Sequence, residues 1–202
     1  MAKPPLRTEF LTVARQRFAQ KGFHATTTRE LNAALAASEG SLYYYFPKGK
    51  RQLLDEIVAA GATWPAPGAW SLAQVDTPEA VERQLLAGLA SWWQAFLRPE
   101  VYQTLLIVVR ERAELRSAQV AWFQKRRDQM QAQVQQALQT LTGPLRLPLA
   151  QAQALAVLIV ALYRNCLWET LGLAGQPNGS RDLPAALRPE LHLLVQQCWG
   201  LT

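Results

Sequence analysis

Residues that favour turns and helix ends divide residues 6–60 into segments so short that each can form only a small helix. The spacing of these residues restricts the fold more than any other feature. Between the signals, apolar residues recur at three- and four-residue spacing, the period of an amphipathic helix. A first helix is predicted to end at Gly22, which is typical of a helix C-terminus. Its inward residues are Leu6, Phe10, Val13, Ala14 and Phe18.

Two shorter helices are predicted to follow. Thr27 and Glu30 have the spacing of a capping box, in which the threonine accepts from a main-chain N–H at the start of a helix. That helix fades by Ala37. Ser38 is a candidate cap for the next helix, Glu39–Phe46, which Pro47 and Gly49 end.

The rest of the chain continues in helices. After a fourth helix at 50–60, prolines and glycines in residues 61–76 indicate a connection. Alanine, leucine and glutamine dominate, and β-branched runs are scarce, so the chain is predicted to be all-α with about nine helices. The later helices are expected at 77–97, 101–114, 117–141, 149–173 and 185–199.

Positive charge is concentrated at the N-terminal end. Residues 1–60 hold nine Lys or Arg against five Asp or Glu, whereas residues 61–202 hold twelve against ten. A small basic module is typical of proteins that bind a polyanion such as nucleic acid, although many basic surfaces are only solvated.

Three tyrosines occupy the short third helix. Leu42 and Phe46, four residues apart, share the face that would anchor this helix to a core, and Tyr43, Tyr44 and Tyr45 fan around its other faces. A short second helix after a tight turn, within a basic three-helix unit, describes a helix-turn-helix, whose second helix enters the major groove of DNA. A phenol there can donate to phosphate or contact a thymine methyl group. Alternatively, the three tyrosines are half-buried and only pack against the core.

The stretch TTTRELNAALAASEGSLYYYFPKGKRQLL closely resembles the DNA-binding signature of the TetR (tetracycline-repressor) family. The resemblance covers about residues 6–58 and includes GFHATT at 22–27. The F-P-x-G-K turn, one residue longer than usual, is similar to that of the LmrA/YxaF-like branch.

The resemblance implies a homodimeric, ligand-responsive transcriptional repressor on a double-stranded DNA operator. Residues 1–49 would form the DNA-binding domain, and residues 50–202 would supply a linker helix and an effector-binding and dimerisation domain. Thr27, Thr28, Tyr44, Tyr45 and Lys50 would contact the DNA backbone, with Lys48 beside them in the same turn. Gly40, Ser41 and Tyr43 would face bases.

Three positions depart from the family pattern. Ala36 stands in the turn where glycine is usual, and an alanine forced to positive φ is costly, so a different turn is expected. Asn32 replaces a small residue. Glu39 replaces a frequent lysine, and it could accept a hydrogen bond from a cytosine amino group or act through the helix dipole.

All seven tryptophans lie beyond residue 60, where rings at helical spacing predict either a solid core or a pocket for a small aromatic or lipophilic effector. Arg110, Glu111, Arg164, Asn165 and Glu169 could supply polar groups, or could form exposed ion pairs on a helix face. The candidate effector-binding residues are Trp92, Trp93, Phe96, Tyr102, Trp122, Phe123, Tyr163 and Trp168.

The helices at 149–173 and 185–199 are apolar over much of their circumference, which favours burial between two subunits, and the resemblance implies that they form the dimer interface. No catalytic constellation, metal-ligand spacing or cofactor motif is present, so neither an enzyme nor a cofactor is expected. The longest uncharged apolar run, 155–163, is too short to span a bilayer, and a cytoplasmic protein with reduced cysteines is predicted. A regulator controlled by a protein partner, or by no ligand, and an activator remain alternatives.

Overall fold

The structure is a computed structural model, and it describes residues 5–62, 71–173 and 187–199. These residues form nine α-helices and two short 3-10 helices, and they contain no strand. The prediction of an all-α chain is therefore confirmed.

The chain divides into two compact units that do not follow chain order. The first unit comprises Met1–Pro65 and Arg98–Trp122, and the second comprises Ala66–Leu97 and Phe123–Thr202. The sequence prediction placed one boundary at residue 49, between a DNA-binding domain and everything after it. That boundary stays a prediction about function, since the first unit joins residues from both sides of it.

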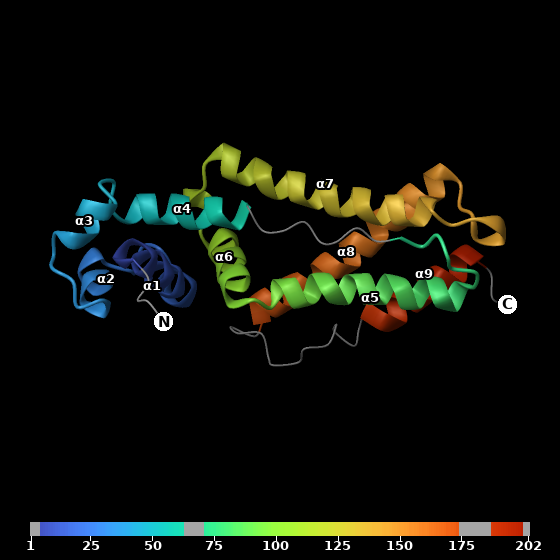
Figure 1. Cartoon of the computed structure of the whole chain (residues 1–202), viewed down its shortest axis with the longest axis horizontal. Coiled ribbons are helices and arrows are strands. Elements are labelled where there is room, and N and C mark those ends of the chain that lie inside the picture. The colour runs from blue at the N-terminus through green and yellow to red at the C-terminus, as the bar shows by residue number, and fades with distance from the viewer. Residues whose placement is uncertain (1–4, 63–70, 174–186, 200–202) are drawn as a thin grey trace. The chain divides into compact units, whose positions relative to one another are not determined.

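The first unit contains five helices, one 3-10 helix and the first turns of a sixth helix (Figure 1). α1 packs against both α4 and α6, and α2 packs between α1 and α3. Phe10, Phe18, Leu53 and Ile107 are fully or almost fully buried, so apolar residues from three helices meet in this core. The elements are α1 (Leu6–Lys21), α2 (Thr28–Ala34), α3 (Ser41–Tyr45), α4 (Lys50–Ala62), α6 (Pro99–Arg110), η1 (Arg112–Glu114) and the start of α7 (Ser117–Gln139).

Local signals account for the end of α1 and the start of α2. Gly22 follows α1 at φ 92°, and Thr27 Oγ1 accepts from the Glu30 N–H at 3.2 Å, as the capping box predicts. The third helix begins later than predicted, at Ser41, because Ser38 Oγ meets Ser41 Oγ at 2.7 Å and caps no helix. The predicted helix over 101–114 begins earlier and ends at Arg110, where η1 takes over.

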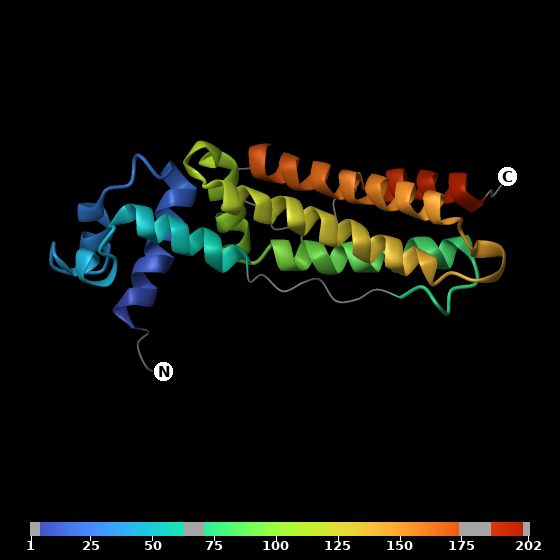
Figure 2. The ribbon, with the colours of Figure 1, turned by 90° about the horizontal axis from the view of Figure 1, so that it is seen from above.

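The second unit is built from long helices that run side by side (Figures 1 and 2). Thr77 caps α5, because its side chain accepts from the Ala80 N–H. α9 packs against both α5 and α8, and it buries Leu187, Leu191 and Val195. The elements are α5 (Pro78–Phe96), the remainder of α7, η2 (Gly143–Leu145), α8 (Leu149–Leu173) and α9 (Leu187–Trp199).

Helix α8 is apolar but only half covered. Its stretch Leu149–Glu169 is long and apolar enough to cross a membrane by length and composition, although the uncharged apolar run within it, 155–163, is short. Ala156, Ile159, Val160 and Tyr163 are buried on its inner face, and α9 packs against it. One core helix of this kind is no evidence of a membrane span.

Candidate nucleic-acid interface and effector region

The turn between α2 and α3 contains one alanine in a conformation that favours glycine. Ala36 has φ 49°, the single positive-φ residue other than glycine in the described chain. The expectation of a differently shaped turn is therefore wrong. The main-chain oxygen of Asn32 accepts from Leu35 N at 3.1 Å and from Ala37 N at 2.9 Å, and these bonds hold the turn around the alanine.

Helix α3 buries its apolar residues and exposes its phenols. Leu42 and Phe46 have no exposed surface, whereas Tyr43 is 52% exposed and Tyr44 80% exposed. Tyr45 is half-buried, with its ring centroid 6.3 Å from that of Phe10. The predicted division of α3 into an anchoring face and a tyrosine face is thus present in the structure. We call Tyr43 and Tyr44 the tyrosine surface.

The turn after α3 supports one of these rings. Gly49 lies at φ 60°, and a Cβ atom there would come within 3.0 Å of Cε1 of Tyr43. A side chain at this position would therefore strain the backbone and push the ring aside. The glycine of the F-P-x-G-K turn fixes where the Tyr43 ring can lie.

The other predicted contact residues lie near the two helix starts. Thr27 is exposed as the cap of α2, and Thr28 is the first residue of that helix. Glu39 and Gly40 are exposed, and Ser41 begins α3. These residues can present main-chain N–H groups and hydroxyls to an anionic backbone.

The two lysines of the turn after α3 have different surroundings. Lys48 is exposed, and its main-chain N–H donates to Gln52 Oε1 at 3.2 Å. The Lys50 ammonium donates to the carbonyl oxygens of Phe23 at 2.6 Å, Thr26 at 2.8 Å and His24 at 3.3 Å. It also lies 4.4 Å from the centre of the Phe23 ring.

These contacts use every donor that the Lys50 ammonium has. Burial lowers the pKa of Lys50, and the negative charges of Glu111 and Glu114 oppose this effect. Lys50 therefore ties the first turn of α4 to the loop before α2. Its predicted contact with the DNA backbone stays a prediction.

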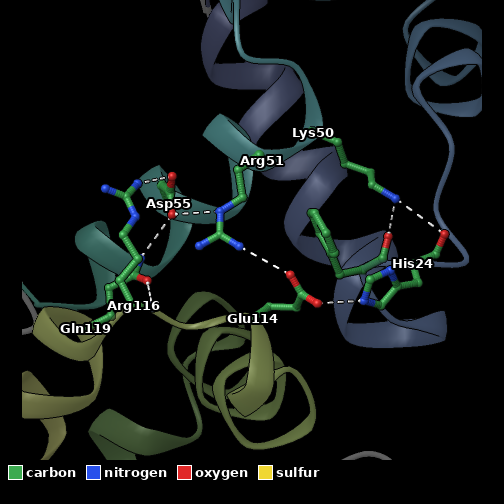
Figure 3. A network of polar contacts seen from close by, with 8 residues as sticks. His24, Lys50, Arg51, Asp55, Glu114, Arg116 and Gln119 are labelled. Atoms are coloured by element: carbon green, nitrogen blue, oxygen red, sulfur yellow. Dashed lines mark hydrogen bonds and ion pairs between the residues drawn. The ribbon is translucent and has the colours of Figure 1, made fainter.

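Carboxylates at the end of α6 and in η1 hold the same loop, and Figure 3 shows the one in η1, Glu114. Glu111 Oε1 accepts from the Phe23 N–H at 2.8 Å. Glu114 bridges His24 Nε2 at 3.0 Å and Arg51 Nη1 at 3.3 Å. Three segments that are distant in sequence are thus connected by ion pairs and hydrogen bonds within the first unit.

The network continues along α4. Arg51 Nε lies 3.4 Å from Asp55 Oδ1, and Arg116 pairs with the same carboxylate (Figure 3). Arg110 donates to the carbonyl of Ala19 at 2.6 Å. Arg110 and Glu111, which the sequence offered as polar groups for an effector, thus contact α1 and the loop after it.

A family comparison covers this helix-turn-helix. The model of bacterial regulatory proteins of the tetR family matches residues 10–57, from the middle of α1 to the middle of α4. Residues 10–57 therefore match the DNA-binding domain of the TetR family. Members of this family are DNA-binding transcription factors, which supports the prediction that the chain is not an enzyme.

A curated relative agrees with this assignment over the same region. The HTH-type transcriptional repressor KstR2 of Rhodococcus jostii (strain RHA1) is 42% identical over 52 residues. That match covers 26% of this chain and 25% of the repressor, so the chain spans only about a quarter of the relative's length in this comparison.

Solved structures of the family share the whole fold. The regulator PfmR from Thermus thermophilus aligns over 96% of this chain and 98% of its own, with a TM-score of 0.60 and 17% identity. AibR in complex with isovaleryl coenzyme A and operator DNA aligns over 96% and 98%, with a TM-score of 0.57 and 17% identity. At these identities the likeness concerns the fold alone.

The second unit contains a buried aromatic cluster. Trp92, Trp93 and Phe96 of α5 and Tyr163 of α8 are each at least 95% buried. The rings of Trp92 and Tyr163 meet edge to face, with centroids 5.5 Å apart. The buried Nε1 of Trp93 has no hydrogen-bond partner among the described residues.

The other predicted effector residues have different surroundings. Trp168 is 51% exposed on α8, because its position falls on the outer face of that helix. Tyr102 is buried in α6 and Trp122 half-buried in α7, and both belong to the first unit. The side chain of Phe123 lies outside the described residues.

The outer face of α8 carries several exposed apolar residues. Ala154, Val157, Leu158, Ala161 and Trp168 recur at three-, four- and seven-residue spacing and are all exposed, with Val157 and Leu158 each 49% exposed. We call these five residues the α8 face. On α9, Leu193 is 66% exposed.

Proposed function

We propose that this chain is a dimeric, ligand-responsive transcriptional repressor that binds a pseudo-palindromic DNA operator through α2 and α3. The exposure of Tyr43 and Tyr44 on a helix whose Leu42 and Phe46 are fully buried carries this proposal. An anchored helix that exposes phenols next to a capped helix start offers groups for phosphates and for base edges.

The residues divide by the groups they offer. Gly40, Ser41 and Tyr43, near the start of α3, would face bases, and exposed Glu39 could accept from a cytosine amino group. The DNA backbone would be contacted from two helix starts and one turn. Those residues are Thr27, Thr28, Tyr44, Tyr45 and Lys48, with Lys50 behind them supporting the loop before α2.

We assign dimerisation to α8 and α9. The α8 face leaves apolar side chains in water unless a partner covers them, and Leu193 exposes more of the same chemistry on α9. A second copy of this chain would cover this surface in a closed two-fold arrangement, and it would present two copies of α3 to two half-sites.

The effector would bind at the aromatic cluster of α5 and α8. The four rings are apolar and buried, and the Nε1 of Trp93, which has no partner among the described residues, would donate to an acceptor on the ligand. A small aromatic or lipophilic compound that carries a carbonyl or similar acceptor fits this chemistry. AibR, a protein with this fold, is known in complex with isovaleryl coenzyme A and with operator DNA.

Helix α4 would transmit the signal. It leads directly from the turn after α3, and Arg51 and Asp55 connect it to Glu114 and Arg116. A change at α6 or η1 would therefore move α4 and alter the spacing of two recognition helices in a dimer. A coupling of about 1–3 kcal/mol would weaken operator binding roughly five- to 150-fold.

Selection from random double-stranded DNA tests the proposal. The full-length protein is expected to enrich a two-fold symmetric motif with half-sites about one helical turn apart. Binding should weaken steeply as salt is raised, because phosphate contacts release counterions. Failure to enrich any sequence, or enrichment of an asymmetric single site, would overturn the proposal.

Effector control has its own readout. Aromatic and lipophilic compounds would be screened for quenching of tryptophan emission and for release of the selected operator at the same concentrations. Operator binding that no compound changes would leave a regulator controlled by a protein partner, or by no ligand, as the better description. Reporter expression in cells with and without the protein would separate repression from activation, and fractionation would test the predicted cytoplasmic location. Membership of the LmrA/YxaF-like branch also stays a prediction.

A further inference from the structure

We infer that Asn32 is a positioning residue that sets the placement of α3 and, through it, the base preference of the protein. The inference rests on the proposed DNA-binding function. Asn32 lies on α2, and its side chain is buried, with 4% of the residue exposed. It can therefore act on DNA only through α3.

The Asn32 amide holds the N-terminal end of α3. Its Nδ2 donates to the main-chain oxygen of Glu39 at 3.1 Å, directly before Gly40, the residue that precedes the helix. Gly40 offers no side-chain cap, and a helix of five residues is too short to be stable alone. Burial of Leu42 and Phe46 fixes one side of α3, and the Asn32 bond fixes where the helix starts.

The bond defines which way the amide points. A flipped amide would bring its oxygen against the Glu39 oxygen, so Nδ2 must be the atom that faces Glu39. The other atom, Oδ1, is then buried without a hydrogen-bond partner among the described residues. An unsatisfied buried acceptor offsets much of what the one bond contributes to stability. Asn32 therefore contributes more to the geometry of α3 than to stability.

The same residue also organises the turn. The Asn32 main-chain oxygen accepts from Leu35 and Ala37 on either side of Ala36, whose φ is 49°. The side-chain amide and the main-chain carbonyl of Asn32 thus both hold the path from α2 to α3. A change of the side chain alone leaves the main-chain bonds in place and shifts only the start of α3.

Paired binding measurements on full-length protein test the inference. The probes are a duplex selected by the unmodified protein and an unselected duplex of equal length. Asn32→Ala and Asn32→Asp both remove the donor, and the aspartate also sets a negative charge against the Glu39 carbonyl. Both variants should bind the selected duplex about tenfold more weakly and the unselected duplex as before, so the specificity ratio falls. An unchanged ratio in both variants would overturn the inference.

Two further variants separate positioning from stability. Asn32→Ala combined with Ala36→Gly should be at least as stable as the unmodified protein, because glycine relieves the positive φ, and its specificity ratio should remain low. Ala14→Gly, in the core of α1, lowers stability away from α3 and should keep the ratio. The effect would be assigned to stability, and the inference overturned, by either of two results. One is that Ala36→Gly restores the specificity ratio of Asn32→Ala, and the other is that Ala14→Gly lowers this ratio as much as Asn32→Ala does. If the unmodified protein does not discriminate between duplexes, the proposed function fails with it.

Discussion

Helices α3 and α8 both leave large side chains in water, but the chemistry of the two surfaces differs. On α3 the exposed groups are the phenols of Tyr43 and Tyr44, at 52% and 80% exposure. On the α8 face, Val157 and Leu158 have no group that can form a hydrogen bond, and each is 49% exposed. Phenols combine an apolar ring with a hydroxyl, so they suit a charged partner and a hydrated interface. Aliphatic groups suit an apolar interface from which water is excluded.

The difference indicates that exposure alone does not identify a partner. The tyrosine surface lies on a five-residue helix that Leu42 and Phe46 anchor to the core, and its exposed hydroxyls can form hydrogen bonds with water. The α8 face lies on a 25-residue helix that still exposes apolar area, so a partner that covers this area lowers the free energy of the protein. This contrast is why we propose DNA as the partner of the first surface and a second copy of the chain as the partner of the second surface.

Charges placed on the α8 face should have the largest effect. Val157→Asp combined with Leu158→Asp would bury unpaired carboxylates four times in a two-fold interface, and we expect the dimer dissociation constant to rise roughly a thousandfold or more. Sedimentation velocity would measure it. Gln84→Asp with Ala87→Asp, on exposed positions of α5, is the matched control and should leave association unchanged. If the two double variants have the same dimer dissociation constant, the α8 face is not part of the interface.

The tyrosine surface should itself divide in two. Tyr43→Ala should lower affinity for a selected operator about 10- to 100-fold and reduce the preference over unselected DNA, because this ring lies near the start of α3 against Gly49. Tyr44→Ala should weaken both duplexes by the same smaller factor, since a phosphate contact carries no sequence information. Fluorescence anisotropy with both duplexes measures the split. Loss of preference in Tyr44→Ala but not in Tyr43→Ala would reverse the assignment.

The two lysines beside the tyrosines should behave differently. Lys50→Ala removes three hydrogen bonds from a charged group and should lower the free energy of unfolding by about 2 kcal/mol. Lys48→Ala should leave stability unchanged and reduce the salt dependence of DNA binding by about one phosphate contact per chain. Urea denaturation and salt titrations would measure the two effects. If the Lys50→Ala protein is as stable as the unmodified protein but binds DNA more weakly, Lys50 contacts the DNA backbone, as the family resemblance implies.

The smallest effect is expected in the turn. Ala36→Gly relieves a positive φ of 49° and should raise the free energy of unfolding by about 0.5–1 kcal/mol, because the relieved strain exceeds the added freedom of the unfolded chain. Thermal denaturation would detect it as a small rise in midpoint. Ala33→Gly, inside α2, should be destabilising and serves as the control. A destabilising Ala36→Gly would contradict the strain argument.

Much of the first unit could be predicted from its sequence because its signals are local. Thr27 and Glu30 have capping-box spacing, and the observed cap bond joins them. Leu42 and Phe46 are four residues apart, and both are fully buried. The start of α3 was predicted too early, because Ser38 bonds to another hydroxyl in place of a helix N–H.

The polar network could not be predicted, because its partners are far apart in sequence. Glu114 meets His24 across 90 positions and Arg51 across 63 positions. The acceptors of Lys50 are main-chain oxygens, which leave no pattern in side-chain chemistry. Asn32 stood out only as a departure from the family pattern, and the structure was needed to find its bond to Glu39.

Stoichiometry on DNA tests both surfaces at once. Sedimentation of the full-length protein with a labelled, selected operator at micromolar concentration would count chains per duplex. The account predicts two chains per operator, with Val157→Asp/Leu158→Asp reducing the complex to one weakly bound chain. Saturation at one chain per operator with full affinity, or the same affinity for every duplex, would contradict a dimer that reads DNA through the tyrosine surface.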